Sequence, residues 1–197
     1  MSSYSQLARR VRAHLDQDHR YRHTVRVARY ADVLAQHHGL DSGKARLAGM
    51  LHDLARLYSS ERLLEECVQR GMTIDAFESA NPIVLHARLG VELAREEFGV
   101  TDPEVLSAIE KHTVGAAQMS PLDCTLYLAD GLEPAREFPE RAALWELARR
   151  DLGAAMRGVI LSSVRYVTGK GLRVAPQTVA AARTFGIELK ETELSAN

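Results

Sequence analysis

The sequence predicts an all-α protein, a single-domain helical bundle. Nearly every long segment has its apolar residues at the helical period, and the alternation that is typical of strands is scarce. Of the 197 residues, 46% are hydrophobic and 26% are charged, which suits one packed core. The chain has no internal repeat and no Ser/Gly/Pro-rich linker. We therefore expect a single domain over residues 1–197.

Capping residues mark the ends of the helices that we expect in the first half of the chain. Glycine adopts the left-handed conformation at a helix C-terminus at little cost, so Gly39 ends one helix and Gly71 another. Ser59 or Ser60 supplies a hydroxyl that caps the start of a helix. The expected helices cover about Ser5–His14, Arg20–His38, Ser42 to just before Ser59, and the segment from there to Gly71.

Proline and aspartate mark helix starts in the second half of the chain. Asp102-Pro103 is the clearest case, because the aspartate caps a helix whose first turn accepts the proline. A break is expected near Asp151. The expected helices cover about Ile83–Phe98, Pro103–His112, Pro121–Leu132, Glu140–Val167 and Pro176–Phe185, and the tail after Glu188 is expected to fray.

The charge and the cysteines exclude several classes of protein. The formal net charge is −1, so no overall positive field attracts nucleic acid or anionic lipid. Cys67 and Cys124 form no CxxC pair, which argues against a disulfide framework and a thiolate zinc site. The polar N-terminus lacks the apolar core of a signal peptide, and no apolar run approaches the roughly 20 residues that cross a bilayer. We expect a cytoplasmic protein with no nucleic-acid or membrane partner.

Six polar side chains lie where helices should be apolar. A lone histidine on such a face is more often a hydrogen-bonded core residue, but burying an unpaired carboxylate costs several kcal/mol. His52 and Asp53 interrupt the apolar segment LAGMLHDLARL, and Asp130 ends the run TLYLAD. One or two divalent cations would satisfy all six groups together. The sequence therefore predicts a metal site built from His23, His52, Asp53, His86, His112 and Asp130.

The types of these ligands limit the metal. Imidazole and carboxylate without thiolate suit iron, manganese, cobalt, zinc or nickel. Adjacent residues of a helix point about 100° apart, so His52 can bind one ion while Asp53 reaches sideways to bridge two. Ligands from at least four helices would also hold the bundle together.

The order of these residues resembles a known signature. His23, His52-Asp53 and Asp130 are similar to the H…HD…D pattern of the HD-domain metal-dependent phosphohydrolases. The segments HRYRHTVRVA, LHDLAR, KHTVG and LYLADGLEPAREFP resemble the YqeK family of bacterial HD proteins, over a core from about residue 19 to 173. That family hydrolyses diadenosine tetraphosphate symmetrically, to two molecules of ADP. The resemblance implies the same activity here, with a nucleotide as the small-molecule partner.

The resemblance also implies a centre of two metal ions, usually iron, bridged by a water or hydroxide that acts as the nucleophile; manganese, cobalt and zinc are alternatives. At Arg56, Gly131 and Ala135 the chain departs from the usual residues, which affects the nucleotide pocket and removes no ligand. The implied ligand sets are His23, His52, Asp53 and Asp130 for one ion, and Asp53, His86 and His112 for the other.

A long polyanionic substrate requires fixed cations beside the metals. Arg56 stands one turn beyond His52 and is the first candidate, although a solvated surface charge is the alternative for each candidate cation. Glu133 would orient Arg136 or a water, or is an ordinary loop charge. The candidate catalytic residues are Asp53, Arg56, Lys111 and Arg136, and the candidate substrate-binding residues are Arg56, Lys111, Thr113, Glu133 and Arg136.

Three functions stay open at this point. The first is the diadenosine tetraphosphate hydrolase. The second is an HD enzyme with the same metal core that acts on another nucleotide, such as a nucleotidase or a cyclic-dinucleotide phosphodiesterase. The third is a scaffold that keeps the metal for stability, against which the intact ligand set speaks. The sequence is compatible with a homodimer, and it places Cys67 and Cys124 in the core and His14, His37 and His38 at the surface.

Overall fold

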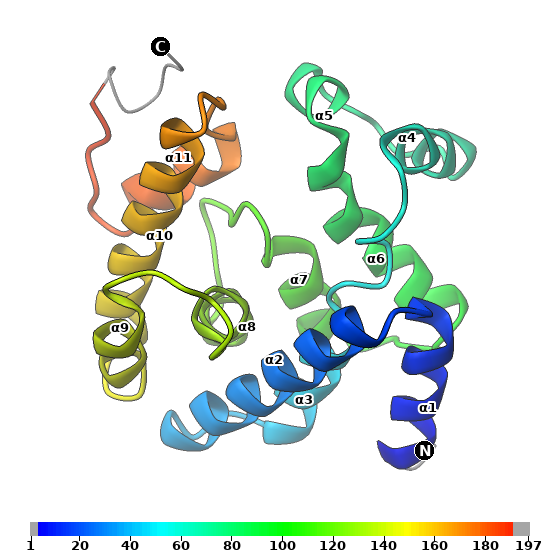
Figure 1. The fold of residues 1–197 in the computed structure, drawn as a ribbon, viewed down its shortest axis with the longest axis horizontal. Helices are drawn as coiled ribbons and strands as arrows, with labels where there is room; N and C mark the ends of the chain where they lie inside the picture. Colours follow the sequence, from blue (N-terminus) through cyan, green and yellow to red (C-terminus); the bar gives the residue numbers. More distant parts are fainter. Residues whose placement is uncertain (1–3, 191–197) are drawn as a thin grey trace.

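The computed structural model describes residues 4–190, which form an all-α fold as the sequence predicts. These residues contain eleven α-helices and one short 3-10 helix, and no strand. In chain order (Figure 1), the elements are α1 (Tyr4–Leu15), α2 (Asp18–His37), α3 (Ser42–Leu51), α4 (Ser60–Gln69), α5 (Ala76–Ala80), η1 (Pro82–Val84), α6 (Leu85–Glu96), α7 (Pro103–Lys111), α8 (Pro121–Leu132), α9 (Arg141–Ala148), α10 (Leu152–Gly169) and α11 (Pro176–Thr184).

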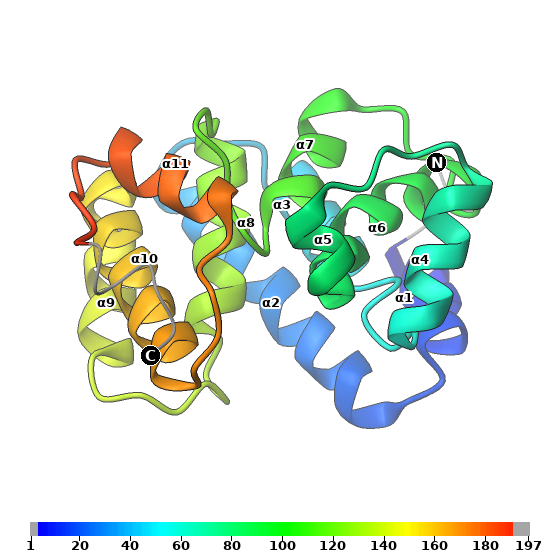
Figure 2. The ribbon, with the colours of Figure 1, turned by 90° about the horizontal axis from the view of Figure 1, so that it is seen from above.

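The helices are arranged around a central group formed by α2, α3, α7 and α8. Figure 2 shows α9, α10 and α11 at one end of the molecule and α1, α4, α5 and α6 at the other. Helix α2 packs against both α3 and α8, and α8 also packs against α7 and α10. This arrangement brings segments from both halves of the chain against α2.

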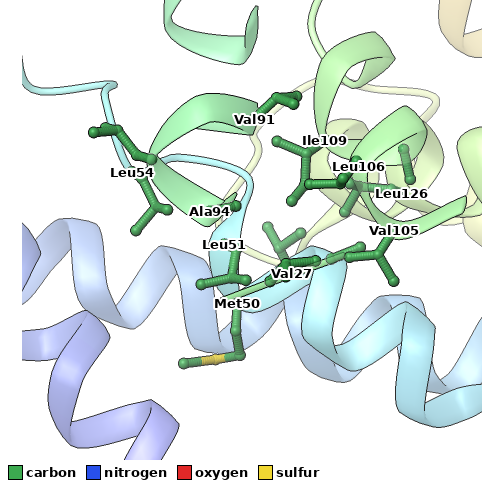
Figure 3. Close-up of a cluster of buried hydrophobic side chains, with 14 of the residues drawn as sticks. Val27, Met50, Leu51, Leu54, Val91, Ala94, Val105, Leu106, Ile109 and Leu126 are labelled. Carbon is green, nitrogen blue, oxygen red and sulfur yellow. The ribbon is translucent and has the colours of Figure 1, made fainter. Parts of the chain in front are cut away.

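Two clusters of buried hydrophobic residues fill the bundle. The larger cluster contains residues of α1, α2, α3, α4, α6, α7 and α8, and Figure 3 shows part of it, where side chains of α2, α3, α6, α7 and α8 gather. The smaller cluster contains residues of α8 to α11 together with Leu34 of α2. Helix α8 contributes to both, for example with Leu126 to the larger and Leu128 to the smaller. Helix α8 therefore connects the two clusters.

Two glycines permit close contacts between helices. A Cβ atom on Gly49 would lie 2.6 Å from the Cα of Ala28, so α3 and α2 approach to a distance that no larger residue allows. A Cβ atom on Gly131 would lie 3.0 Å from Cγ1 of Val159 in α10. Gly131 is one of the positions at which the sequence departs from the family that it resembles. In the structure, this position lies at the contact of α8 with α10.

The predicted caps account for several helix starts. The Ser59 hydroxyl accepts a hydrogen bond from the N–H of Arg62, and the Asp102 carboxylate accepts one from Glu104. The predicted break near Asp151 is confirmed, because α9 ends at Ala148 and the Asp151 carboxylate caps α10. The predicted fraying after Glu188 falls mainly on residues 191–197, which lie outside the described residues.

The third predicted helix was too long. Helix α3 ends at Leu51, and residues 52–57 form turns, so His52 and Asp53 follow the helix instead of lying within it. The His52 ring explains the end, because its Nδ1 donates to the carbonyl oxygen of Gly49 at 2.8 Å. That oxygen is the one that the N–H of Asp53 would take if the helix continued.

The short helix α5 is missing from the predicted set. Five residues are too few for a periodic pattern, but a capping box was readable. The Asp75 carboxylate accepts from the N–H of Glu78 at 2.7 Å, and the Glu78 carboxylate accepts from the N–H of Asp75 at 2.9 Å.

The surface placement of two histidines was wrong. The ring of His14 bonds the carbonyl oxygen of Leu54 at 2.9 Å and is half-buried, and the ring of His38 bonds that of Ala148 at 2.7 Å. Both rings therefore join helix ends to distant segments. The third ring, that of His37, is exposed as expected, and both cysteines are buried. Within residues 4–190, no helix has the length and apolar character that crossing a bilayer requires.

Candidate metal centre

The six predicted ligands converge inside the bundle. His23 comes from α2, His86 from α6 and Asp130 from α8, whereas the other three follow the ends of α3 and α7. The ligand atoms of one group lie within 4.8 Å of one another, and so do those of a second group. All six are buried except the half-buried Asp130. The two groups are His23, His52 and Asp130, and His52, Asp53 and His112.

The carboxylate of Asp53 stands between two pairs of histidines. Its Oδ2 lies 3.3 Å from Nε2 of His52 and 3.5 Å from Nε2 of His23. Its Oδ1 lies 3.5 Å from Nε2 of His86 and 3.8 Å from Nε2 of His112. Each oxygen thus faces its own pair of imidazole nitrogens, an arrangement suited to a carboxylate that bridges two cations. Asp130 joins the first pair, with Oδ1 3.2 Å from Nε2 of His23.

The ring orientation of all four histidines is set at Nδ1. Because the partner of each Nδ1 is an oxygen that can only accept, Nδ1 carries the proton and Nε2 presents its lone pair to the centre. For His23 the partner is the Glu133 carboxylate, at 3.2 Å. For the other three it is the backbone carbonyl three residues earlier: His52 to Gly49 at 2.8 Å, His86 to Ile83 at 2.5 Å, and His112 to Ile109 at 2.7 Å.

The site favours ionised carboxylates throughout and neutral imidazoles at His86 and His112, where burial lowers the pKa of the ring. Burial would lower the pKa of His23 as well, but its hydrogen bonds with Asp130 and Glu133 outweigh burial and raise this pKa instead. Burial would raise the pKa of Asp130, but the His23 hydrogen bond and the Arg136 charge hold this pKa well below its usual range. The pKa of Asp53 is likewise low despite burial, chiefly because His52 lies beside it. Burial, with help from His52 and His86, lowers the pKa of His112 to about 3. For Asp53, Asp130 and His112, these are the protonation states that metal ligands require.

The donor set fits two divalent cations. Four imidazoles and two carboxylates meet in a buried space, without thiolate, and the two oxygens of the Asp53 carboxylate face different pairs of imidazoles. Arginines partly balance the buried negative charge. Nη1 of Arg20 lies 2.8 Å from Oδ2 of Asp53, and Nη2 of Arg136 lies 2.6 Å from Oδ1 of Asp130.

Three of the predicted substrate-binding residues lie beside this centre. The guanidinium of Arg136 donates to the carboxylate and the carbonyl oxygen of Asp130 and is 44% exposed, so it can also reach a ligand from solvent. Oγ1 of Thr113 lies 3.0 Å from Nε2 of His112. Arg56 is half-buried, and its charge is one of the causes that lower the pKa of His86, after burial.

The other two predicted residues have structural partners. Nζ of Lys111 donates to Oδ2 of Asp123 at 2.8 Å, and Asp123 is fully buried. Glu133 is 3% exposed, so the description as an ordinary loop charge was wrong. Burial would raise the pKa of its carboxylate, but hydrogen bonds from His23 and Arg26 hold this pKa at about 2.

Replacing Lys111 with methionine is expected to lower the free energy of unfolding by about 2–4 kcal/mol, because the buried Asp123 would lose its charged partner; the range allows for the partial exposure of Lys111. Urea unfolding of the metal-free protein measures this. Lys44→Met is the control, since the exposed ion pair of Lys44 with Asp102 contributes little to stability and its loss should leave the unfolding curve nearly unchanged. Unchanged stability combined with a raised KM would instead assign Lys111 to the substrate.

The sequence analysis missed two arginines of α2. Arg20 donates to Asp53, and Arg26 donates through Nε to Oε2 of Glu133 at 2.6 Å. Both stand three residues from His23, so the helical period places all three on one face. That spacing was the available signal.

Comparisons with known proteins agree with this geometry. Residues 20–135 match the HD domain family. A symmetrical bis(5'-nucleosyl)-tetraphosphatase from Halalkalibacterium halodurans is 32% identical over 180 residues, which cover 91% of this chain and 95% of the relative. A symmetrical bis(5'-nucleosyl)-tetraphosphatase from Bacillus subtilis is 35% identical over 161 residues, which cover 82% of this chain and 86% of the relative.

A solved structure is also similar over nearly the whole chain. The crystal structure of a predicted HD superfamily hydrolase from Clostridium acetobutylicum has a TM-score of 0.88 and 33% identity, and the match covers 94% of this chain and 97% of that one. The resemblance drawn from the sequence is thereby confirmed. The chain belongs to the HD-domain family, in the YqeK branch whose curated members are named symmetrical bis(5'-nucleosyl)-tetraphosphatases.

Proposed function

We propose that this HD-domain hydrolase cleaves diadenosine tetraphosphate symmetrically, into two molecules of ADP, at a centre of two divalent metal ions. One observation carries the two-ion part: each carboxylate oxygen of Asp53 faces a separate pair of histidine nitrogens. The names of the relatives support the substrate. The alternative, an HD enzyme for another nucleotide, shares the same metal ligands.

The proposed ligands form two sets, one for each ion, and the two sets have Asp53 in common. Iron is the metal that we expect, and manganese, cobalt or zinc suit the same nitrogen and oxygen donors. The ions would supply Lewis-acid stabilisation and a bridging hydroxide as the nucleophile. The first ion would be held by His23, His52, Asp53 and Asp130, and the second by Asp53, His86 and His112.

The roles of the surrounding side chains follow from their positions. Arg136 neutralises Asp130 in this structure, and its exposed guanidinium is suited to exchange that partner for a substrate phosphate. Arg56 adds a second positive charge near the His86 side of the centre. Thr113 places a hydroxyl that can donate to a phosphate oxygen. These residues would bind the polyphosphate and stabilise the charge of the departing ADP.

The products test the proposed cleavage position. Attack of water on one of the two inner phosphorus atoms breaks its bond to the central bridging oxygen, and this oxygen leaves with ADP. We expect two ADP and no AMP or ATP, as measured by chromatography with metal present. In H2(18)O, half of the ADP molecules should carry one heavy oxygen. AMP with ATP would contradict symmetrical cleavage, and turnover of other nucleotides alone would favour the alternative enzyme.

The last two expectations concern the binding partners of the protein. The nucleotide substrate is consistent with the relatives, and the described residues give no support for the homodimer. The scaffold hypothesis predicts metal binding without turnover, so the same product assay tests it.

A further inference from the structure

The four histidines of the centre fall into two classes according to what holds Nδ1. In three of them the partner is a backbone carbonyl within the same turn of chain. In His23 the partner is the side chain of Glu133, which lies 110 residues later in the sequence. Of these four rings, that of His23 alone therefore has an orientation that depends on a distant, negatively charged side chain.

Glu133 is itself held in place from several directions. Oε2 accepts from Nε of Arg26 at 2.6 Å and from the N–H of Ala135 at 2.9 Å, and Oε1 accepts from Nη2 of Arg26 at 3.3 Å. Arg26 follows His23 by one turn of α2, so it braces the carboxylate against the same helix that presents the ring. The carboxylate is almost completely buried, so little of it faces solvent.

A carboxylate on Nδ1 affects a histidine ligand in two ways. It fixes the tautomer and the ring orientation, and it makes Nε2 a stronger donor than a carbonyl partner does. Residues in this position typically change metal affinity by about 10- to 100-fold when they are removed. Glu133 contacts His23 alone among the four histidines, so its effect falls on one side of Asp53.

We propose that Glu133, braced by Arg26, is a positioning residue that strengthens the ion site of His23, His52, Asp53 and Asp130 and leaves the site of His86 and His112 unaffected. The inference rests on the proposed two-ion centre and assigns Glu133 to metal binding instead of substrate binding. The first site also has two carboxylates against one in the second, so it should fill first.

Titration of the metal-free protein with Co2+ tests this inference, with binding followed by calorimetry and by the visible cobalt spectrum. We expect two binding steps in the wild type. Glu133→Ala should weaken the tighter step by about 10- to 100-fold and leave the weaker step unchanged. In Glu133→Gln, the affinity of the tighter step should lie between that of the wild type and that of Glu133→Ala, because the amide oxygen still accepts from Nδ1. At saturating metal, both variants should regain most of the wild-type kcat with an unchanged KM.

A matched control separates this effect from the loss of a buried ion pair. Glu78 is also almost fully buried and accepts two hydrogen bonds from Arg88, at 2.7 and 2.9 Å, but these residues lie outside the metal ligands. Glu78→Ala should lower stability without changing either binding step. Circular dichroism establishes that each variant is folded, and Glu133→Gln serves if the alanine variant is not.

Unchanged binding steps in the folded Glu133 variants would overturn the inference, as would equal weakening of both steps. A raised KM with unchanged metal binding would return Glu133 to the substrate site. Absence of metal binding by the wild type is a different outcome, because it would contradict the proposed two-ion function itself.

Discussion

Asp53→Ala is expected to lose both metal ions and to reduce hydrolysis by about 10³-fold or more, the scale at which a principal electrostatic stabiliser is removed. The reason is geometric, because among the six proposed ligands Asp53 is the one side chain whose two oxygens face both histidine pairs. Elemental analysis of the purified variant and a rate assay with added metal measure the two effects. Retention of two ions with a normal rate would show that Asp53 does not bridge.

A second variant of Asp53 separates the effect of its charge from that of its size. Asp53→Asn keeps the size of the side chain and removes the negative charge, so it should lose metal nearly as completely as the alanine variant.

Arg56→Ala should keep both ions and lower kcat or raise KM, because Arg56 lies near the centre without being a proposed ligand. Metal loss in Arg56→Ala would place this residue in the support of the metal site instead.

Chelation is expected to abolish hydrolysis, and ferrous or cobaltous ion is expected to restore it. The described donors are nitrogen and oxygen atoms, and the chemistry proposed for them requires a Lewis acid and an activated water. The assay compares the untreated protein, the chelated protein and the chelated protein with each metal added. Full turnover by the metal-stripped protein would refute the proposed function.

The same chelation experiment has an expected thermal signature. An ion at a hundred times its Kd stabilises the folded state by about 2.7 kcal/mol, which corresponds to a rise in Tm of about 5–10 °C for a chain of this length. The metal-free protein should remain helical, because the two hydrophobic clusters are built without the metal ligands. Circular dichroism at rising temperature checks both points.

The fold was largely predictable because its signals are local. Apolar period and caps place the helices, as Asp102 and Asp151 show at the starts of α7 and α10. The end of α3 was less predictable, since it depends on the ring of His52 taking the carbonyl of Gly49 from the backbone. Competition between a side chain and the helix leaves no periodic signature.

The proposed ligands were predictable as a group for a different reason. Polar groups such as Asp53, which interrupts an apolar segment, need compensation when they are buried, so their presence indicated a shared site. Their supporting partners were not predictable in the same way. The contacts of Glu133 with His23 and of Lys111 with Asp123 depend on how separate helices pack. The sequence around Glu133 and Lys111 does not distinguish these two residues from charged residues at the surface.

Helix α8 belongs to both hydrophobic clusters, and this has a consequence for how the chain can vary. It carries Asp130, and Glu133 directly follows it, while its other face packs against α10 at Gly131. In a metal site, each metal–ligand distance lies within about 0.2 Å of its standard value. A substitution in α10 that changes its packing on α8 would therefore displace Asp130, a proposed ligand that α10 does not supply. Under the proposed function, metal coordination thus limits how the contact of α10 with α8 can change.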